Sequence, residues 1–132
     1  PRFSLETGMD LSGLARDPTV VEQILADPLF HRRATARLST EVTATIARIQ
    51  AGAPAFSLPD LILHGSDDRM VPPDGSRAFI VRAGSSDKRL IEYPGAYHAL
   101  FADVGREAPL ADVSGWIEER LAPPLAPAGT AG

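Results

Sequence analysis

Two short runs with the pattern of β-strands, each followed by residues able to do acid–base chemistry, constrain the fold of this chain most. "LILH" at 61–64 leads into "GSDDR", and "KRLIEY" at 88–93 leads into "PGAYH". The first run is apolar and lies between Pro59 and Gly65, which is typical of a strand covered on both faces. The second follows the turn-rich "SSD" (85–87) and ends at Pro94-Gly95. Residues 73–84 lie between the runs and have a helical pattern that ends at a glycine. The alternation of strand, helix and strand predicts an α/β fold with parallel strands.

Candidate catalytic residues follow both predicted strands. Parallel strands joined by a crossover helix have their carboxyl ends at the same edge of the sheet, so Asp68 and His98 are expected to meet there. A carboxylate bonded to one imidazole nitrogen leaves the other nitrogen free to take a proton from a nucleophile. Asp67 is the alternative acid if the turn is shifted by one residue. Taken singly, Asp68 could simply cap a turn, and His98 could simply pack at a strand end.

The segments around these two residues carry a family resemblance. "LILHGSDDRMVPPDGSR" (61–77) and "AGSSDKRLIEYPGAYHALF" (83–101) resemble the C-terminal half of monoacylglycerol lipases and related lysophospholipases of the α/β-hydrolase fold. In that family G-x-x-D-R carries the triad acid and Y-P-G-x-Y-H carries the triad base. The resemblance therefore implies Asp68 as the acid and His98 as the base. Residues 14–38 resemble the part of the family's lid that precedes the acid-bearing strand.

The nucleophile of this family lies in a G-x-S-x-G turn between a strand and a helix. None of the serines in this chain has glycine both two residues before it and two residues after it, so the G-x-S-x-G turn is absent from the sequence. His64-Gly65 is similar to a dipeptide found near the oxyanion hole of lipases, but here it leads directly into the acid turn. We therefore interpret His64 as a structural residue, and expect the serine and the oxyanion donors to lie outside this chain.

The predicted fold is the C-terminal part of an α/β-hydrolase, with two parallel strands, flanking helices and a preceding helical lid. Residues 1–52 are the predicted lid segment and residues 53–122 the predicted part of the hydrolase core. Residues 123–132 are a Pro/Ala/Gly tail that we expect to be disordered.

Helix signals define the predicted elements outside the strands. Asp17-Pro18 predicts a helix start, and Asp27-Pro28 its end. A second apolar stripe ends before Gly52, and residues 105–121 form a third helix with a predicted buried stripe of Leu110, Val113, Trp116, Ile117 and Leu121. Residues 1–16 show no clear period and are expected to be irregular. Their apolar residues could fill a core or line an acyl-chain tunnel: Phe3, Met9, Leu11 and Leu14.

Composition excludes several classes of function. The net charge of −4 argues against a nucleic-acid-binding protein, and the absence of cysteine excludes disulfides and thiolate metal sites. The three histidines are dispersed, so no metal or other cofactor is expected. The basic run at 31–37 predicts a solvated helix face, with contact to anionic lipid as the alternative. No apolar run approaches the roughly 20 residues of a membrane span, and a cytoplasmic or peripherally membrane-associated location is favoured.

Stability considerations predict a partner. Two strands do not form an independently stable sheet, and an uncovered strand edge favours association. The expected partner is the N-terminal half of the same hydrolase or a swapped copy of this chain. A truncated chain that folds loosely is the third possibility.

The sequence thus predicts part of a serine carboxyl-ester hydrolase that cannot act alone, with a small-molecule ester or lipid as substrate. Monoacylglycerols or lysophospholipids are the expected substrates because of the lid resemblance, although esterases, peptidases and dehalogenases share the fold. The alternative is a non-catalytic remnant that binds lipid or forms oligomers.

Overall fold

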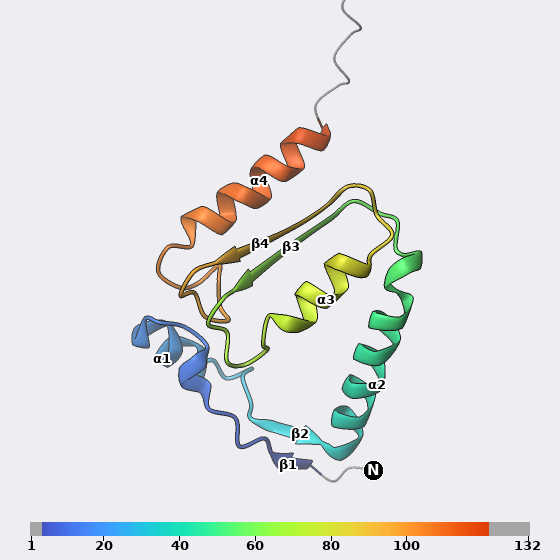
Figure 1. Ribbon diagram of the computed structural model, residues 1–132. Coiled ribbons are helices and arrows are strands. Elements are labelled where there is room, and N and C mark those ends of the chain that lie inside the picture. The colour runs from blue at the N-terminus through green and yellow to red at the C-terminus, as the bar shows by residue number, and fades with distance from the viewer. Residues whose placement is uncertain (1–3, 122–132) are drawn as a thin grey trace, which may run out of the picture.

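A computed structural model of the protein describes residues 4–121 (Figure 1). The tail predicted for 123–132 lies outside the described residues, as does Phe3. The elements in chain order are β1 (Ser4–Glu6), a 3-10 turn (Leu11–Gly13), α1 (Pro18–Ala26), β2 (Arg33–Thr35), α2 (Ala36–Gly52), a second 3-10 turn (Ala53–Ala55), β3 (Asp60–Gly65), α3 (Asp74–Arg82), β4 (Lys88–Tyr93) and α4 (Glu107–Leu121).

The parallel strand pair predicted from the sequence is confirmed. β3 and β4 pair in parallel, with a register that runs from Asp60 opposite Lys88 to Gly65 opposite Tyr93. α3 links the two strands, and α3 and α4 lie on either side of the pair (Figure 1). Both strands therefore end at the same edge, where the predicted acid and base follow them.

The prediction that residues 1–16 are irregular is wrong for two short segments. β1 pairs with β2 in antiparallel fashion, and residues 11–13 form a 3-10 turn. The guanidinium of Arg33 donates to the carbonyl and hydroxyl oxygens of Ser4, at 2.9 and 3.1 Å. Part of the basic run at 31–37 therefore belongs to a strand, so the run is not a single helix face.

α1 begins at the cap predicted from the sequence, and α2 also begins at a capping side chain. Asp17 Oδ1 accepts a hydrogen bond from the Thr19 N–H at 2.8 Å, and Pro18 occupies the first position of α1. Thr35 Oγ1 accepts from the Leu38 N–H at 3.1 Å, which starts α2 directly after β2. α2 includes Gly52 as its last residue, one residue beyond the predicted end.

One group of buried apolar residues lies where the N-terminal part of the chain meets the loop after β4, and a second, Ala53 and Ala83, lies where the turn after α2 meets the end of α3. Leu11 and Leu14 are each 9% exposed, which favours a core role over an open tunnel, whereas Met9 is largely exposed. The Leu14 carbonyl accepts a hydrogen bond at 2.7 Å from the Ala99 N–H, in the loop that follows β4. This contact joins residues 11–14 to the loop that carries His98.

The stripe of α4 that was predicted to be buried is largely uncovered. Leu110, Ile117 and Leu121 are exposed to solvent, and Val113 and Trp116 are half-buried. β3 was expected to be covered on both faces, but most of its residues are half-buried. The apolar stripe of α2 is also exposed, at Leu38, Val42, Ile46 and Ile49. The prediction of a buried stripe on α4 is therefore wrong for residues 4–121, because no other described segment covers this face.

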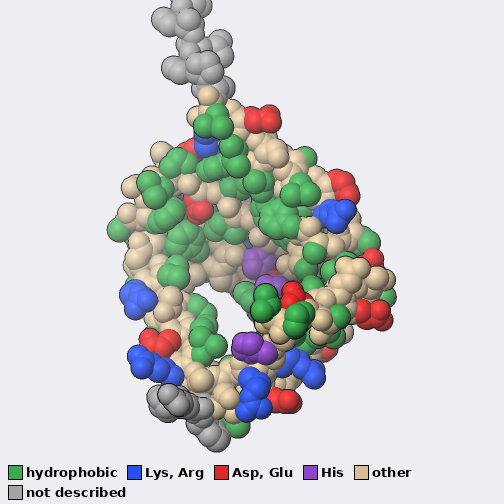
Figure 2. Space-filling model, turned by 180° about the vertical axis from the view of Figure 1, so that it is seen from behind, with side chains coloured by type: hydrophobic (Ala, Val, Ile, Leu, Met, Phe, Trp, Pro, Cys, Tyr) green, Lys and Arg blue, Asp and Glu red, His purple; other side chains and the backbone are tan. Residues whose placement is uncertain are grey.

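Figure 2 shows an open gap in the molecule, with hydrophobic and histidine side chains on its edge. In Figure 1 this region lies between α2, the β1–β2 pair and the chain that follows β3.

No helix within residues 4–121 has both the length and the hydrophobicity that are needed to span a bilayer.

Candidate active site

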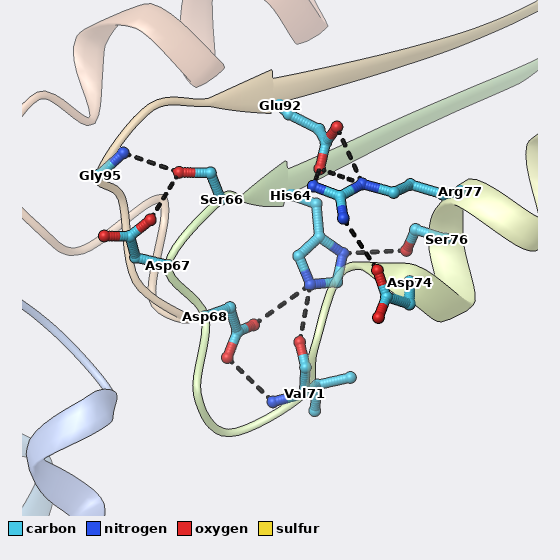
Figure 3. Close-up of polar contacts among 10 residues, drawn as sticks. All are labelled: His64, Ser66, Asp67, Asp68, Val71, Asp74, Ser76, Arg77, Glu92 and Gly95. Atoms are coloured by element: carbon cyan, nitrogen blue, oxygen red, sulfur yellow. Dashed lines mark hydrogen bonds and ion pairs between the residues drawn. The ribbon is translucent and has the colours of Figure 1, made fainter.

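Asp68 lies in the turn that follows β3, where backbone N–H groups hold its carboxylate (Figure 3). Oδ1 accepts from the N–H groups of Met70 and Val71, at 2.8 and 2.9 Å. The residue is 6% exposed. Two bonds to one oxygen fix the plane of the carboxylate and direct Oδ2 towards the loop after β4.

His98 meets this second oxygen. Its Nδ1 lies 2.8 Å from Asp68 Oδ2, which makes Nδ1 the donor and leaves Nε2 with a lone pair in the neutral ring. The His98 side chain is 42% exposed, and no residue in 4–121 makes a hydrogen bond to its Nε2. The spacing predicted that the two residues meet, and the structure places them in contact. An imidazole held in this way, with one nitrogen bonded to a carboxylate and the other open, has the geometry that general-base catalysis requires.

The electrostatic environment keeps Asp68 ionised. Burial alone raises the pKa of its carboxyl, but hydrogen bonds from the Val71 and Met70 N–H groups and from His98 outweigh burial. The net direction of the pKa is downward from the ordinary value of 3.8. At neutral pH Asp68 is therefore an anion able to stabilise a charged imidazolium on His98.

Asp67, the alternative acid, points elsewhere. Its Oδ1 accepts a hydrogen bond from the Ser66 hydroxyl at 2.8 Å, and Figure 3 shows its side chain directed away from His64. The Ser66 oxygen in turn accepts from the Gly95 N–H at 2.8 Å. Ser66 therefore links the turn after β3 to the turn after β4, and Asp68 is the acid in contact with His98.

A buried carboxylate that the sequence did not reveal holds the His98 loop from its other end. Asp103 is 4% exposed and accepts from the Arg16 backbone N–H at 2.9 Å, the Arg16 Nε–H at 3.0 Å and the Asp17 N–H at 3.0 Å. The Val104 N–H also donates to it, at 2.8 Å. Because Asp103 and Arg16 are far apart in sequence, no local pattern indicates this contact. The cluster ties the start of α1 to the loop after His98.

His64 lies at the end of β3, as predicted, but it also contacts the acid. Its Nε2 lies 3.3 Å from Asp68 Oδ2 and 2.8 Å from the Val71 carbonyl oxygen. Beside the three residues is a cavity of about 130 Å³, with Leu63, Val71 and Leu100 in its wall. Residues 4–121 contain no group of three or more acidic, histidine or cysteine side chains that could hold a metal ion.

Comparison with known proteins gives the family. Residues 1–105 match the hydrolase family described as serine aminopeptidase, S33. This chain belongs to that family. The hydrolase chain is 36% identical to the monoacylglycerol lipase of Mycolicibacterium smegmatis, over 86% of its own length and 41% of the relative. It is 26% identical to the phospholipase YtpA of Bacillus subtilis, over 81% of its length and 42% of the relative.

A solved structure gives the same result for the fold. The monoacylglycerol lipase of Paleococcus ferrophilus matches with a TM-score of 0.82 and 34% identity, over 88% of this hydrolase chain and 46% of that protein. The resemblance to monoacylglycerol lipases and the partial α/β-hydrolase fold are both confirmed. The chain spans less than half the length of the relatives that it matches.

Proposed function

We propose that this chain supplies the acid and the base of the catalytic triad in a serine carboxyl-ester hydrolase that acts on monoacylglycerols or lysophospholipids. The observation that carries the proposal is the 2.8 Å contact between His98 Nδ1 and Asp68 Oδ2, with His98 Nε2 unbonded within residues 4–121. The nucleophilic serine and the oxyanion donors come from a segment outside these 132 residues.

The geometry supports a two-step ester hydrolysis. His98 Nε2 accepts the proton of the serine hydroxyl as its oxygen attacks the ester carbonyl carbon, and Asp68 stabilises the resulting imidazolium. The imidazolium then protonates the leaving alcohol oxygen as the ester bond breaks, which leaves an acyl-serine. Water then attacks the acyl-serine as His98 takes one of its protons. The imidazolium returns this proton to the serine oxygen as the acyl–oxygen bond breaks, which releases the fatty acid and regenerates the serine hydroxyl and neutral His98.

Two observations support a lipid ester as the substrate. The relatives reported above are named monoacylglycerol lipases and a phospholipase. The cavity beside His98 is lined by Leu63, Val71 and Leu100 together with His64, Asp68 and His98, so an apolar wall lies next to the proposed base.

The partner in this proposal is the N-terminal part of a hydrolase of the same family, or a swapped copy of this chain. The exposed apolar stripes of α2 and α4 are the faces that such a partner would cover. The open edges of the two-stranded β3–β4 sheet would pair with its strands.

Co-expression tests the proposal. This chain is produced with an N-terminal hydrolase segment that carries a G-x-S-x-G turn, and the assembly is called the complemented enzyme below. Monoacylglycerol hydrolysis should appear and should be lost with His98→Ala. His31→Ala, at an exposed histidine, is the matched control and should leave the rate unchanged. Full hydrolysis with His98→Ala would overturn the proposal. A stable homo-oligomer that never supports hydrolysis would favour the non-catalytic alternative.

A further inference from the structure

A second imidazole shares the carboxylate that orients the proposed base. Asp68 Oδ2 lies 2.8 Å from His98 Nδ1 and 3.3 Å from His64 Nε2. The His64 side chain is 12% exposed, against 42% for His98. The proposed catalytic mechanism uses His98 alone and assigns no step to His64.

The neighbours of His64 determine which ring nitrogen carries the proton. Nε2 lies 2.8 Å from the Val71 carbonyl oxygen, which can only accept, so Nε2 is protonated (Figure 3). In the neutral ring Nδ1 is then an acceptor, and the Ser76 hydroxyl lies 2.9 Å from it. Both nitrogens are engaged inside the protein. His64 therefore has no free lone pair to offer a substrate and cannot replace His98 as the base.

The peptide units around Val71 are held from both sides by this arrangement. The Val71 N–H donates to Asp68 Oδ1, and the Val71 carbonyl accepts from His64 Nε2. Without the bond from His64, the Val71 carbonyl would lose its partner within the protein. The turn could then move, and the Asp68 carboxylate, which is bonded to the Val71 N–H, would move with it. Ser76 in α3 holds the ring at the opposite nitrogen, so the turn is connected to a helix.

We propose that His64 is a positioning residue: its Nε2–H, donated to the Val71 carbonyl oxygen, fixes the 65–71 turn so that Asp68 presents Oδ2 to His98. This inference rests on the proposed ester hydrolysis for its kinetic consequence. The contact that it explains, between Asp68 and His98, can be observed without any activity.

Two amide substitutions separate positioning from space filling. A glutamine amide nitrogen reaches the place of the histidine Nε2, whereas an asparagine side chain reaches only that of Nδ1. In the complemented enzyme, His64→Gln should keep kcat within about threefold of the original chain, whereas His64→Asn should lower kcat by about 10- to 100-fold, with KM changed less than about twofold. The proton resonance of His98 Nδ1–H, followed by NMR, should persist in His64→Gln and be lost or shifted upfield in His64→Asn.

The outcomes are distinguishable from failure of the proposed function. If His98→Ala abolishes hydrolysis while His64→Asn leaves kcat unchanged, the positioning role is wrong and the proposed function stands. If His98→Ala retains full hydrolysis, the proposed function fails, and the NMR resonance alone decides the role of His64. Equal losses in both amide variants would show that the ring only fills space, and would also overturn the inference.

Discussion

The backbone of Tyr97 passes directly over Gly65, with no room for a side chain between them. A Cβ on Gly65 would collide with the carbonyl oxygens of Tyr97 and Ala96, and would lie 2.7 Å from the Ala96 carbonyl carbon. Gly65 ends β3 three residues before the acid, and Tyr97 directly precedes His98. The close approach of the two backbones is therefore part of what brings the acid and the base together.

Gly65→Ala should separate the proposed acid from the base. The added methyl group must push residues 96–97 away and carry His98 with them, which we expect to lower kcat of the complemented enzyme about 100-fold. Gly75→Ala is the matched control, because a Cβ at Gly75 meets nothing within 4 Å. Steady-state kinetics of both variants check the prediction. An unchanged kcat in Gly65→Ala would show that the close approach is not required.

Asp68→Asn should lower kcat of the complemented enzyme by about 10⁴-fold, because an amide can donate to His98 Nδ1 and so favour the wrong tautomer. Asp67→Asn is the control at the neighbouring residue and should keep kcat within about threefold, since Asp67 bonds to Ser66 and is directed away from the site. Kinetic comparison of the two variants identifies the acid. A greater loss with Asp67→Asn would assign the role to the other carboxylate.

Asp103→Asn should destabilise the complemented enzyme by about 1–3 kcal/mol at pH 7, because the new amide group faces N–H donors. Burial raises the pKa of Asp103, but its bonds from backbone N–H groups and from Arg16 outweigh burial and lower the pKa below 3.8. The ionised carboxylate therefore contributes its full stability above pH 3.8, and this contribution is lost as the pH falls through the lower folded-state pKa.

Urea denaturation of the original and Asp103→Asn enzymes at several pH values measures this effect. The difference in the free energy of unfolding should be constant between about pH 5 and 7 and should shrink below about pH 3.8. A difference that grows as the solution is acidified would contradict the sign of the shift.

Ile117→Lys should weaken assembly with the N-terminal segment, because it places a charge in the exposed apolar stripe of α4. Glu118→Lys introduces the same side chain at the adjacent exposed position and is the control. We expect sizing chromatography to show loss of the complex with Ile117→Lys and its retention with Glu118→Lys. Equal retention in both variants would show that this stripe is not the interface.

Local sequence signals were sufficient for the strand pair, whereas the choice of Asp68 and His98 also needed the family resemblance. The runs at 61–64 and 88–93 lie in β3 and β4, and the parallel crossover brings Asp68 and His98 to one edge. The strands were predictable because each of their signals lies within a few residues along the chain: a run of strand-forming residues, a proline or glycine at its end, and a polar residue just beyond it.

Contacts between distant segments could not be predicted in the same way. β1 and β2 pair over three residues each through their backbones, which leaves little trace in the sequence. Arg16 and Asp17, which hold Asp103 together with its neighbour Val104, lie more than 80 residues away from it along the chain. The prediction of a buried stripe on α4 was wrong for another reason. Amphipathic periodicity identifies an apolar face but does not identify the surface that covers it.

Reactivity of the serine in the separate N-terminal segment tests the central claim most directly. A fluorophosphonate probe labels a serine whose hydroxyl has been activated by a neighbouring base. The claim that His98, oriented by Asp68, is that base predicts rapid labelling when the original chain is present. With His98→Ala, labelling should fall to the level of the N-terminal segment alone. Labelling that is equally rapid with the original chain, with His98→Ala and without this chain would contradict the claim.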